Sequence, residues 1–305
     1  MKLSVITRIA LTYLAFMVSV SACDASGGRG GSGDADSDVD TDACDCPDLD
    51  GISAEDLAAA IGLCPGDDEF SAQILSSSAD GDLGVGIYPY VGNNSCLQAR
   101  HGCQMIALGT GPLEQENPND AQDMGDDGAD NDLDPLPPYQ GLEETTGFTD
   151  PACDVTQLRL SLVAPPDAQG FSFDFVFASS EYDEWVGRGY NDTFYAILEY
   201  EEVNGGAPTN IAFDDNGNEI EVDSNYFENE QHPCSEAGSA WSPDTEEVSG
   251  STGWLRTSWW VSPGAHFDLT FSIHDEGDCI YDSMVLVDDF AWLDSPPAGA
   301  TVPIE

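Results

Sequence analysis

Hydrophobic and polar residues alternate with a period of two in three stretches of the chain. Phenylalanine occupies every second position from 171 to 177, with Ser172 and Asp174 between. Residues 158–162 and 267–273 repeat the pattern with Leu, Phe and Ile at the apolar positions. Because successive side chains of a strand point to opposite faces of a sheet, the pattern predicts half-buried antiparallel strands.

Further short segments have the composition of strands: 193–200, 210–213, 219–222, 283–287 and 290–293. Many short strands with turn residues between them indicate an all-β protein, an antiparallel two-sheet sandwich of jelly-roll-like type. One short N-terminal helix is expected at 53–63, where Ser53 can cap the helix and Leu57 and Ile61 lie one turn apart.

These segments predict a single domain over residues 51–295. Within it, residues 114–138 have the acidic, Pro- and Gly-punctuated composition of a loop insertion. Residues 296–305 are Pro-rich, and we expect a C-terminal tail there. Residues 23–50 are dominated by Gly, Ser and Asp, bury too little apolar surface to fold alone, and are predicted to be an acidic tether.

The N-terminus has the regions of an export signal. Lys2 and Arg8 supply positive charge, and residues 9–20 form an apolar stretch too short to span a bilayer. The string VSAC at 20–23 resembles the lipobox of bacterial lipoproteins, which implies a signal peptide over 1–22 and a lipidated Cys23. The alternative is an ordinary secretory signal cut after residue 22. We expect a lipid-anchored, extracytoplasmic envelope protein, at the outer membrane or cell surface rather than the inner membrane.

The net charge of the chain limits the classes of molecule that it can bind. The net charge is −51, and only five arginines and no lysine follow the expected cleavage site. Nucleic acid is excluded as a partner, because binding phosphates requires cations. The composition favours bound divalent cations or a high-salt habitat. The alternative is a solvated, self-repelling surface that only keeps the protein soluble.

The cysteines agree with export. Eight remain after Cys23, and in an oxidising compartment they can form up to four disulfides. Cys96 and Cys103 are close enough in sequence to close a small loop, and they are the first pair that we expect. A zinc site is the alternative, although paired C-x2-C spacing is missing.

Several motifs occur in a fixed order through the second half of the chain. They are FSFDFVF at 171–177, SEYDEWV at 180–186, NDTF at 191–194, TGWL at 252–255, SPG at 262–264, DEGD at 275–278, DS at 282–283 and DDF at 288–290. Together they resemble the choice-of-anchor L domain of bacterial surface proteins, strongly over 155–294 and weakly back to 63–64 and 105–111. The resemblance implies an extracytoplasmic, β-rich domain without a defined activity, anchored here by lipid. Asp289 stands where the family pattern has Asn, which would add negative charge to an acidic site.

Two acidic loops follow two strands of similar character, those at 171–177 and 267–273. Strands that run the same way in a sandwich place their following loops at one end, where the carboxylates would repel unless a cation lay among them. Ca²⁺ takes six to eight oxygen ligands in flexible geometry. We therefore expect a calcium site formed by Glu181, Asn191, Asp192, Asp275, Asp278 and Asp282. The alternative is that these acids are solvated or cap turns through their own backbone.

A second candidate calcium loop covers 123–134. Asp123, Asp127, Gly128 and Asp134 fall at positions 1, 5, 6 and 12 of such a loop, but position 3 is Gly125 and flanking helices are not predicted. A disordered acidic loop is the alternative.

The sequence offers little sign of catalysis. It lacks G-x-S-x-G, H-E-x-x-H and G-x-x-x-x-G-K motifs, so we do not expect an enzyme. Aromatic residues that could stack on sugars or anchor an interface gather in the second half: Tyr226, Trp241, Trp254, Trp259 and Trp260. The leading prediction is a calcium-binding, lipid-anchored envelope protein that acts in adhesion or surface assembly. The alternative is a carbohydrate-binding or hydrolytic accessory domain that binds a surface glycan or protein.

Overall fold

The computed structural model describes residues 52–64, 66–76, 84–91, 97–111, 113, 153–182, 185–227, 250–276 and 281–304. All of them belong to one compact unit, Val39–Glu305. The predicted signal peptide, tether, acidic insertion at 114–138 and second calcium loop at 123–134 lie outside the described residues. Among the described residues, none of the helices is long and apolar enough to cross a membrane.

The first sheet has six strands, all paired antiparallel. Its order is β1-β6-β13-β8-β10, with β9 paired to β8. The strands are β1 (Glu69–Ser76), β6 (Cys153–Val163), β8 (Thr193–Glu199), β9 (Thr209–Asn210), β10 (Ile220–Glu221) and β13 (His266–Asp275).

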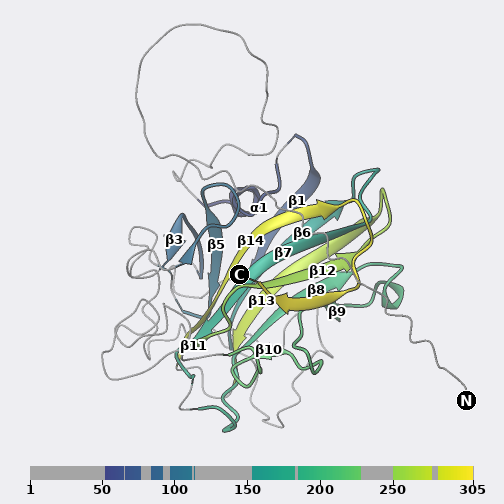
Figure 1. Cartoon of the computed structure of the whole chain (residues 1–305). Helices are drawn as coiled ribbons and strands as arrows, with labels where there is room; N and C mark the ends of the chain where they lie inside the picture. Colours follow the sequence, from purple (N-terminus) through teal and green to yellow (C-terminus); the bar gives the residue numbers. More distant parts are fainter. Residues whose placement is uncertain are drawn as a thin grey trace, which may run out of the picture. The chain divides into compact units, whose positions relative to one another are not determined.

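The second sheet has seven antiparallel strands in the order β15-β12-β7-β14-β5-β2, with β11 paired to β7 (Figure 1). The strands are β2 (Val85–Tyr88), β5 (Met105–Gly109), β7 (Gly170–Ser179), β11 (Gly250–Ser251), β12 (Leu255–Trp260), β14 (Ser283–Leu293) and β15 (Ala300–Pro303). A separate hairpin joins β3 (Tyr90–Val91) and β4 (Leu97–Gln98).

The main core lies between the two sheets. The phenylalanines of β7, in the seven-stranded sheet, pack against residues of the six-stranded sheet. The rings of Phe173 and Phe271 are 4.9 Å apart, as are those of Phe175 and Phe194. All four rings are fully buried. The predicted antiparallel sandwich is thus confirmed, and the phenylalanine face of β7 is its centre.

The prediction of half-buried strands is wrong for β7, which is buried along its whole length. The outer face of its sheet carries a second core, in which Val176, Ala178, Met284 and Leu286 pack with Tyr88 and with residues near the β3–β4 hairpin. The polar residues between the phenylalanines are therefore buried as well, Asp174 completely. On β13, Thr270 and Ser272 are likewise buried rather than outward in solvent.

The predicted helix is present as α1 (Ala54–Ala60). Ser53 accepts a hydrogen bond from the backbone N–H of Asp56, and the Asp56 carboxylate accepts one from the N–H of Ser53. This capping box satisfies N–H groups that the first turn leaves open. Leu57 and Ile61 are buried in the main core, as their spacing predicts. A 3-10 turn, η3 (Asn204–Gly206), follows β8.

The expectation of a C-terminal tail over 296–305 is wrong for the residues that form a strand there. Residues 300–303 form β15, which pairs with β12 at the edge of the seven-stranded sheet. Thr301 fixes this strand: its hydroxyl lies 2.8 Å from that of Thr257, and both side chains are buried. The fold therefore extends beyond residue 295.

Candidate functional site

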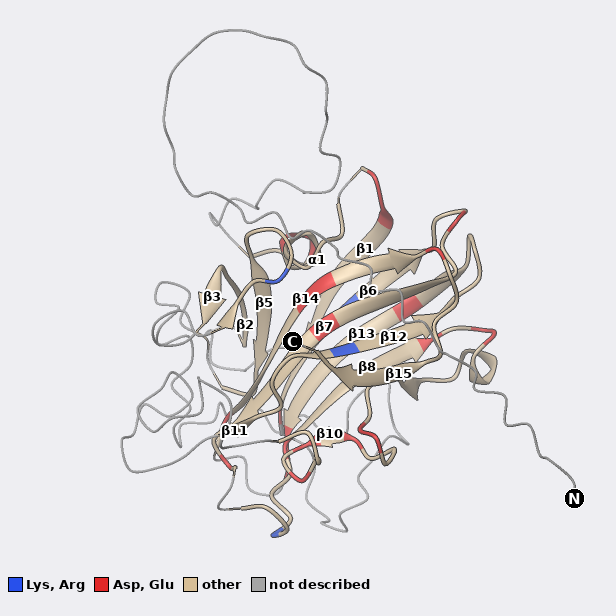
Figure 2. Ribbon diagram, viewed as in Figure 1, with Lys and Arg blue, Asp and Glu red and all other residues tan. Residues whose placement is uncertain are grey.

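The two acidic loops meet at one end of the sandwich. Ser283 at the start of β14 pairs with Ser179 at the end of β7, and Thr193 at the start of β8 pairs with His274 near the end of β13. Hydrogen bonds cross between the loops: the N–H of Asn191 donates to the carbonyl of Glu276 (3.3 Å). Figure 2 shows acidic residues near β10 and β11, at this end of the sheets.

Five of the six predicted metal ligands are described, and all five are buried. Glu181, Asn191, Asp192, Asp275 and Asp282 are each at most 1% exposed. The sixth, Asp278, lies outside the described residues. The alternative that these acids are simply solvated is therefore wrong for the four acids among them. That the five residues bind calcium remains a prediction.

Asp192 is the centre of this acidic end. Its Oδ1 accepts a hydrogen bond from the N–H of Glu276 (3.1 Å), and its carboxyl group also interacts with the side chains of Ser283 and Asp275. The Glu181 carboxylate lies beside it and accepts the N–H of Asp192. Complete burial and the charge of Glu181 raise the pKa of Asp192 well above its ordinary value.

Asp282, which precedes β14, is positioned by residues that follow two other strands of the seven-stranded sheet. Its carbonyl accepts hydrogen bonds from the N–H and the hydroxyl of Ser180, at 3.2 and 3.0 Å. Its carboxylate lies against Gly111, where a Cβ atom would come within 2.2 Å of Oδ2. Only glycine leaves room for this carboxylate, so residue 111 contributes to the site by its lack of a side chain.

The prediction missed a second group of acids that continues this end. Asp223 donates its N–H to Oδ1 of Asn191 (3.0 Å) and accepts the N–H of Gly187 (2.7 Å). Burial, followed by the charges of Glu219, Glu276 and Asp223, raises the pKa of Glu221 to about 8. The alternation Glu219, Glu221, Asp223 along the chain was a signal for one acidic face.

Within the described ranges, the His, Cys, Asp and Glu side chains do not come together in a preformed group of three or more with metal-holding geometry. His274 is buried and its Nε2 lies 2.8 Å from Oε1 of Glu276. The predicted Cys96–Cys103 disulfide stays a prediction, because Cys96 is outside the described residues, as is Cys23.

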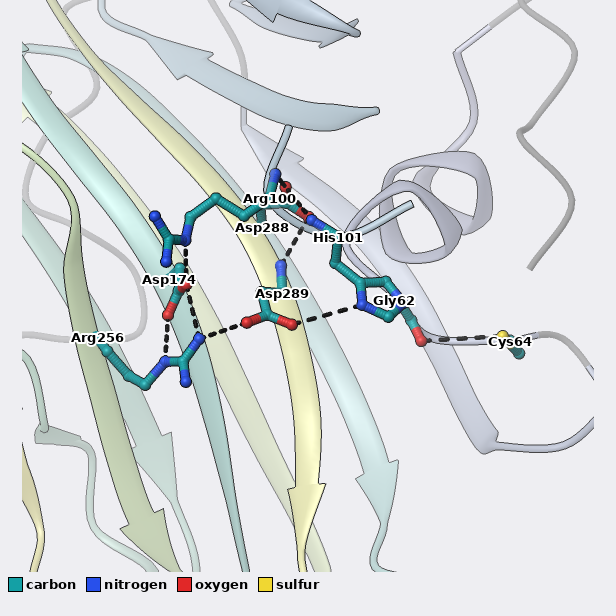
Figure 3. Close-up of polar contacts among 8 residues, drawn as sticks. All are labelled: Gly62, Cys64, Arg100, His101, Asp174, Arg256, Asp288 and Asp289. Atoms are coloured by element: carbon teal, nitrogen blue, oxygen red, sulfur yellow. Dashed lines mark hydrogen bonds and ion pairs between the residues drawn. The ribbon is translucent and has the colours of Figure 1, made fainter. Parts of the chain in front are cut away.

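A second buried carboxylate lies on the outer face of the seven-stranded sheet (Figure 3). Asp174 of β7 is completely buried between two arginines: Nε of Arg100 is 2.7 Å from its Oδ2, and Nη2 of Arg256 is 2.8 Å from the same oxygen. Arg256 also pairs with Asp289. The expectation that Asp289 adds charge to the acidic site is wrong, because this side chain is held by Arg256 and by His101 (3.6 Å) instead.

Asp288, on β14, binds the segment that contains Arg100 and His101. Its carboxylate accepts the backbone N–H groups of Arg100 and His101, which lie between β4 and β5. Burial raises the pKa of Asp288 to about 7, although the hydrogen bonds from Asp289, His101 and Arg100 oppose the shift. The network therefore fastens the 100–101 segment to β14.

The fold and the acidic end define a class: an antiparallel β-sandwich whose strand-connecting loops gather buried carboxylates at one end. The choice-of-anchor L domain model matches residues 66–290, well over half of the chain, so the chain belongs to the choice-of-anchor L domain family. This membership indicates a protein of the cell surface.

Other comparisons add little. No curated protein matches the chain. One solved structure is similar: TmCBM61 in complex with β-1,4-galactotriose, with 11% identity and a TM-score of 0.28, covering 73% of this chain and 87% of that one. At this TM-score the similarity carries no conclusion about ligand or mechanism.

Proposed function

We propose that this chain is a lipid-anchored surface domain of the bacterial envelope that is stabilised by calcium and acts in adhesion or surface assembly. One observation carries the calcium part: five side chains with oxygen atoms that can ligate a cation, from the ends or starts of four strands, are each buried at one end of the sandwich, although they do not form a ready-made metal site. Buried carboxylates at close range are costly unless a cation is present. Calcium accepts such a mixed set of carboxylate, amide and main-chain oxygens.

The protein has few positively charged side chains that could neutralise the carboxylates at the acidic end of the sandwich. Three of the four arginines in the described residues pair with carboxylates elsewhere: Arg100 with Asp174, Arg159 with Glu199 and Asp268, and Arg256 with Asp174 and Asp289. The fourth, Arg188, is exposed and lies over the Trp185 ring. The chain contains no lysine beyond residue 2. An ion from the medium is the further source of positive charge that we propose.

A calcium titration followed by thermal melting tests the proposal. With a Kd of about 10⁻⁴–10⁻³ M, as extracellular modules have, calcium at about 10 mM adds about 1.4–2.7 kcal/mol. The Tm should then rise by about 3–10 °C. Magnesium at the same concentration should raise it much less, because Mg²⁺ demands a stricter octahedral geometry.

A matched pair of variants on β13 separates a site from general screening of charge. Asp275→Asn should remove most of the calcium-induced rise in Tm. Asp268 lies on the same strand but pairs with Arg159, which also pairs with Glu199. Asp268→Asn should therefore keep that rise. If calcium raises the Tm of both variants as it does that of the parent, the calcium proposal is wrong.

The anchor is tested separately. Cys23→Ser should move the chain from the membrane fraction to the soluble extracytoplasmic fraction, and radiolabelled palmitate should enter the parent but not the variant. Labelling of neither chain, with release of both, would support the ordinary secretory signal instead. We also expect the exported cysteines to be oxidised, Cys64 and Cys103 among them.

A further inference from the structure

Three aromatic rings from two separate segments gather beside the acidic end. Trp185 and Tyr190 belong to the connection from β7 to β8, and Tyr281 precedes β14. The ring of Trp185 lies 5.0 Å from that of Tyr190, nearly perpendicular to it, and 6.3 Å from that of Tyr281. All three are partly exposed, whereas the phenylalanines of the main core are fully buried. These rings are not needed to fill the sandwich.

Polar and charged groups border the rings. The exposed guanidinium of Arg188 lies 5.2 Å from the centre of the Trp185 ring, and Val186 beside it is 44% exposed. Because the guanidinium lies over the Trp185 ring, its N–H groups are donors for a molecule that binds beside that ring. The rings therefore offer apolar surface with hydrogen-bond donors next to it.

Backbone hydrogen bonds hold this segment in place. The N–H of Trp185 donates to the carbonyl of Glu181 (3.0 Å), and that of Arg188 donates to the carbonyl of Trp185 (2.9 Å). The Asp223 carboxylate accepts the N–H of Gly187, whose φ of +72° suits glycine. A surface fixed before binding loses less conformational entropy when a ligand arrives.

We infer that Trp185, Tyr190, Tyr281 and Arg188 form a binding site for a neutral glycan. This inference deepens the proposed function, on which it rests, by naming the ligand of the adhesion. Sugar rings have apolar C–H faces that stack on Trp and Tyr, and their hydroxyls accept hydrogen bonds from a guanidinium. An anionic polymer is disfavoured, because the chain has a net charge of −51.

The surface does not suit a large protein interface. A stable interface buries about 800 Å² on each partner around an apolar centre. Among the described residues, the large hydrophobic side chains that are exposed are Val186 and Val302. The aromatic residues predicted from sequence are placed differently: Trp259 packs on Phe213 and Trp260 on Tyr200. The rings at 185, 190 and 281 are the better candidates for sugar binding.

Affinity electrophoresis of the full chain in detergent tests the site, with gels that contain a β-glucan, a galactan, a mannan or polygalacturonate. Trp185→Ala is compared with Trp260→Ala, because each tryptophan is partly exposed and each makes a perpendicular contact with one tyrosine. We expect at least one neutral polysaccharide to retard the parent and Trp260→Ala. Trp185→Ala should bind it at least tenfold more weakly, and Trp185→Phe should recover part of the loss.

The inference is overturned if none of the neutral polysaccharides retards the parent, if polygalacturonate alone does, or if the two alanine variants lose binding equally. The calcium-dependent Tm is measured on the same samples. A parent whose Tm rises with calcium but that binds none of these glycans contradicts the glycan site and leaves the calcium proposal standing. Glycan retardation lost on Trp185→Ala, without any effect of calcium on Tm, supports the site and contradicts the calcium proposal.

Discussion

Two of the regions that hold buried carboxylates differ in what neutralises these groups. On the outer face of the seven-stranded sheet, Asp174 lies between Arg100 and Arg256 (Figure 3). At the end of the sandwich, Asp192 is equally buried but has Glu181 as its charged neighbour, and its pKa is raised. Both regions have the same kind of group at the same depth in the protein.

The difference shows how a chain with 58 acids and seven basic residues distributes its positive charge. The arginines at Asp174 and Asp289, with the backbone contacts of Asp288, hold a distant segment against β14. That role requires positive charge at a fixed position at all times. The acidic end joins loops from both sheets, and an exchangeable cation can stabilise it when the medium supplies one.

The largest effect is expected from breaking the internally neutralised region. Asp174→Ala leaves two partly buried guanidinium groups facing each other, and removing one member of a buried ion pair costs about 3–5 kcal/mol. Asp268→Ala, which breaks a more exposed pair with Arg159, should cost less than about 1 kcal/mol. Urea denaturation gives both values. A loss below about 1 kcal/mol for Asp174→Ala would show that the arginines do not depend on this carboxylate.

The same kind of change at the acidic end should have the opposite sign. Asp192→Asn keeps the shape of the side chain and removes a buried carboxyl group whose pKa is raised, so in EDTA at pH 8 it should stabilise the fold. It should also remove most of the stabilisation by calcium. If Asp192→Asn is less stable than the parent when both are in EDTA, this interpretation of the acidic end is wrong.

The pH dependence gives a smaller effect. Glu221 has a pKa of about 8 against an ordinary 4.5, and the pKa of Asp192 is also raised, so the folded state holds protons that the unfolded state has already released. The contribution of Glu221 to stability is complete below about pH 4 and is lost as the pH rises to about 8, and the raised pKa of Asp192 acts in the same direction. The stabilisation by calcium should grow over this range, because calcium binds carboxylates.

Urea denaturation at pH 5.5, 7 and 8.5, with calcium or EDTA, measures this trend. Glu221→Gln serves as the control and should flatten the calcium-free profile between pH 7 and 8.5. A calcium effect that is larger at pH 5.5 than at pH 8.5 would contradict the assignment.

The smallest effect concerns the geometry at Asp174. Arg256 contacts this carboxylate through both Nε and Nη2 and contacts Asp289 through Nη2. Lysine keeps the charge but not the fork of donors, so Arg256→Lys should cost about 1 kcal/mol, well below the cost of Asp174→Ala. Equal losses for the two variants would mean that charge alone does not hold the region together.

The sequence predicts the sandwich well because alternation reports which face of a strand is apolar. It cannot report that the other face is covered too, since that depends on the β3–β4 hairpin packing on Val176 and Met284. The strand at 300–303 was missed because a four-residue edge strand with Pro303 has the composition of a tail.

For the acidic end, strand direction alone predicted that the loops after β7 and β13 meet, and the structure brings Asn191, Asp192 and Glu276 together. Glu221 was missed because its strand has two residues and lies outside those loops. The ion pair of Arg100 with Asp174 joins positions 74 residues apart, and no local pattern in one sequence indicates such a contact.

Counting bound calcium tests the central claim most directly. The purified full chain, dialysed against about 10 mM calcium in about 0.15 M salt to screen the surface charge, is analysed for metal beside Asp192→Asn and Asp268→Asn. We predict at least one calcium ion per parent chain, the same number for Asp268→Asn, and at least one fewer for Asp192→Asn. Equal calcium in all three proteins, or none in the parent, would contradict the account.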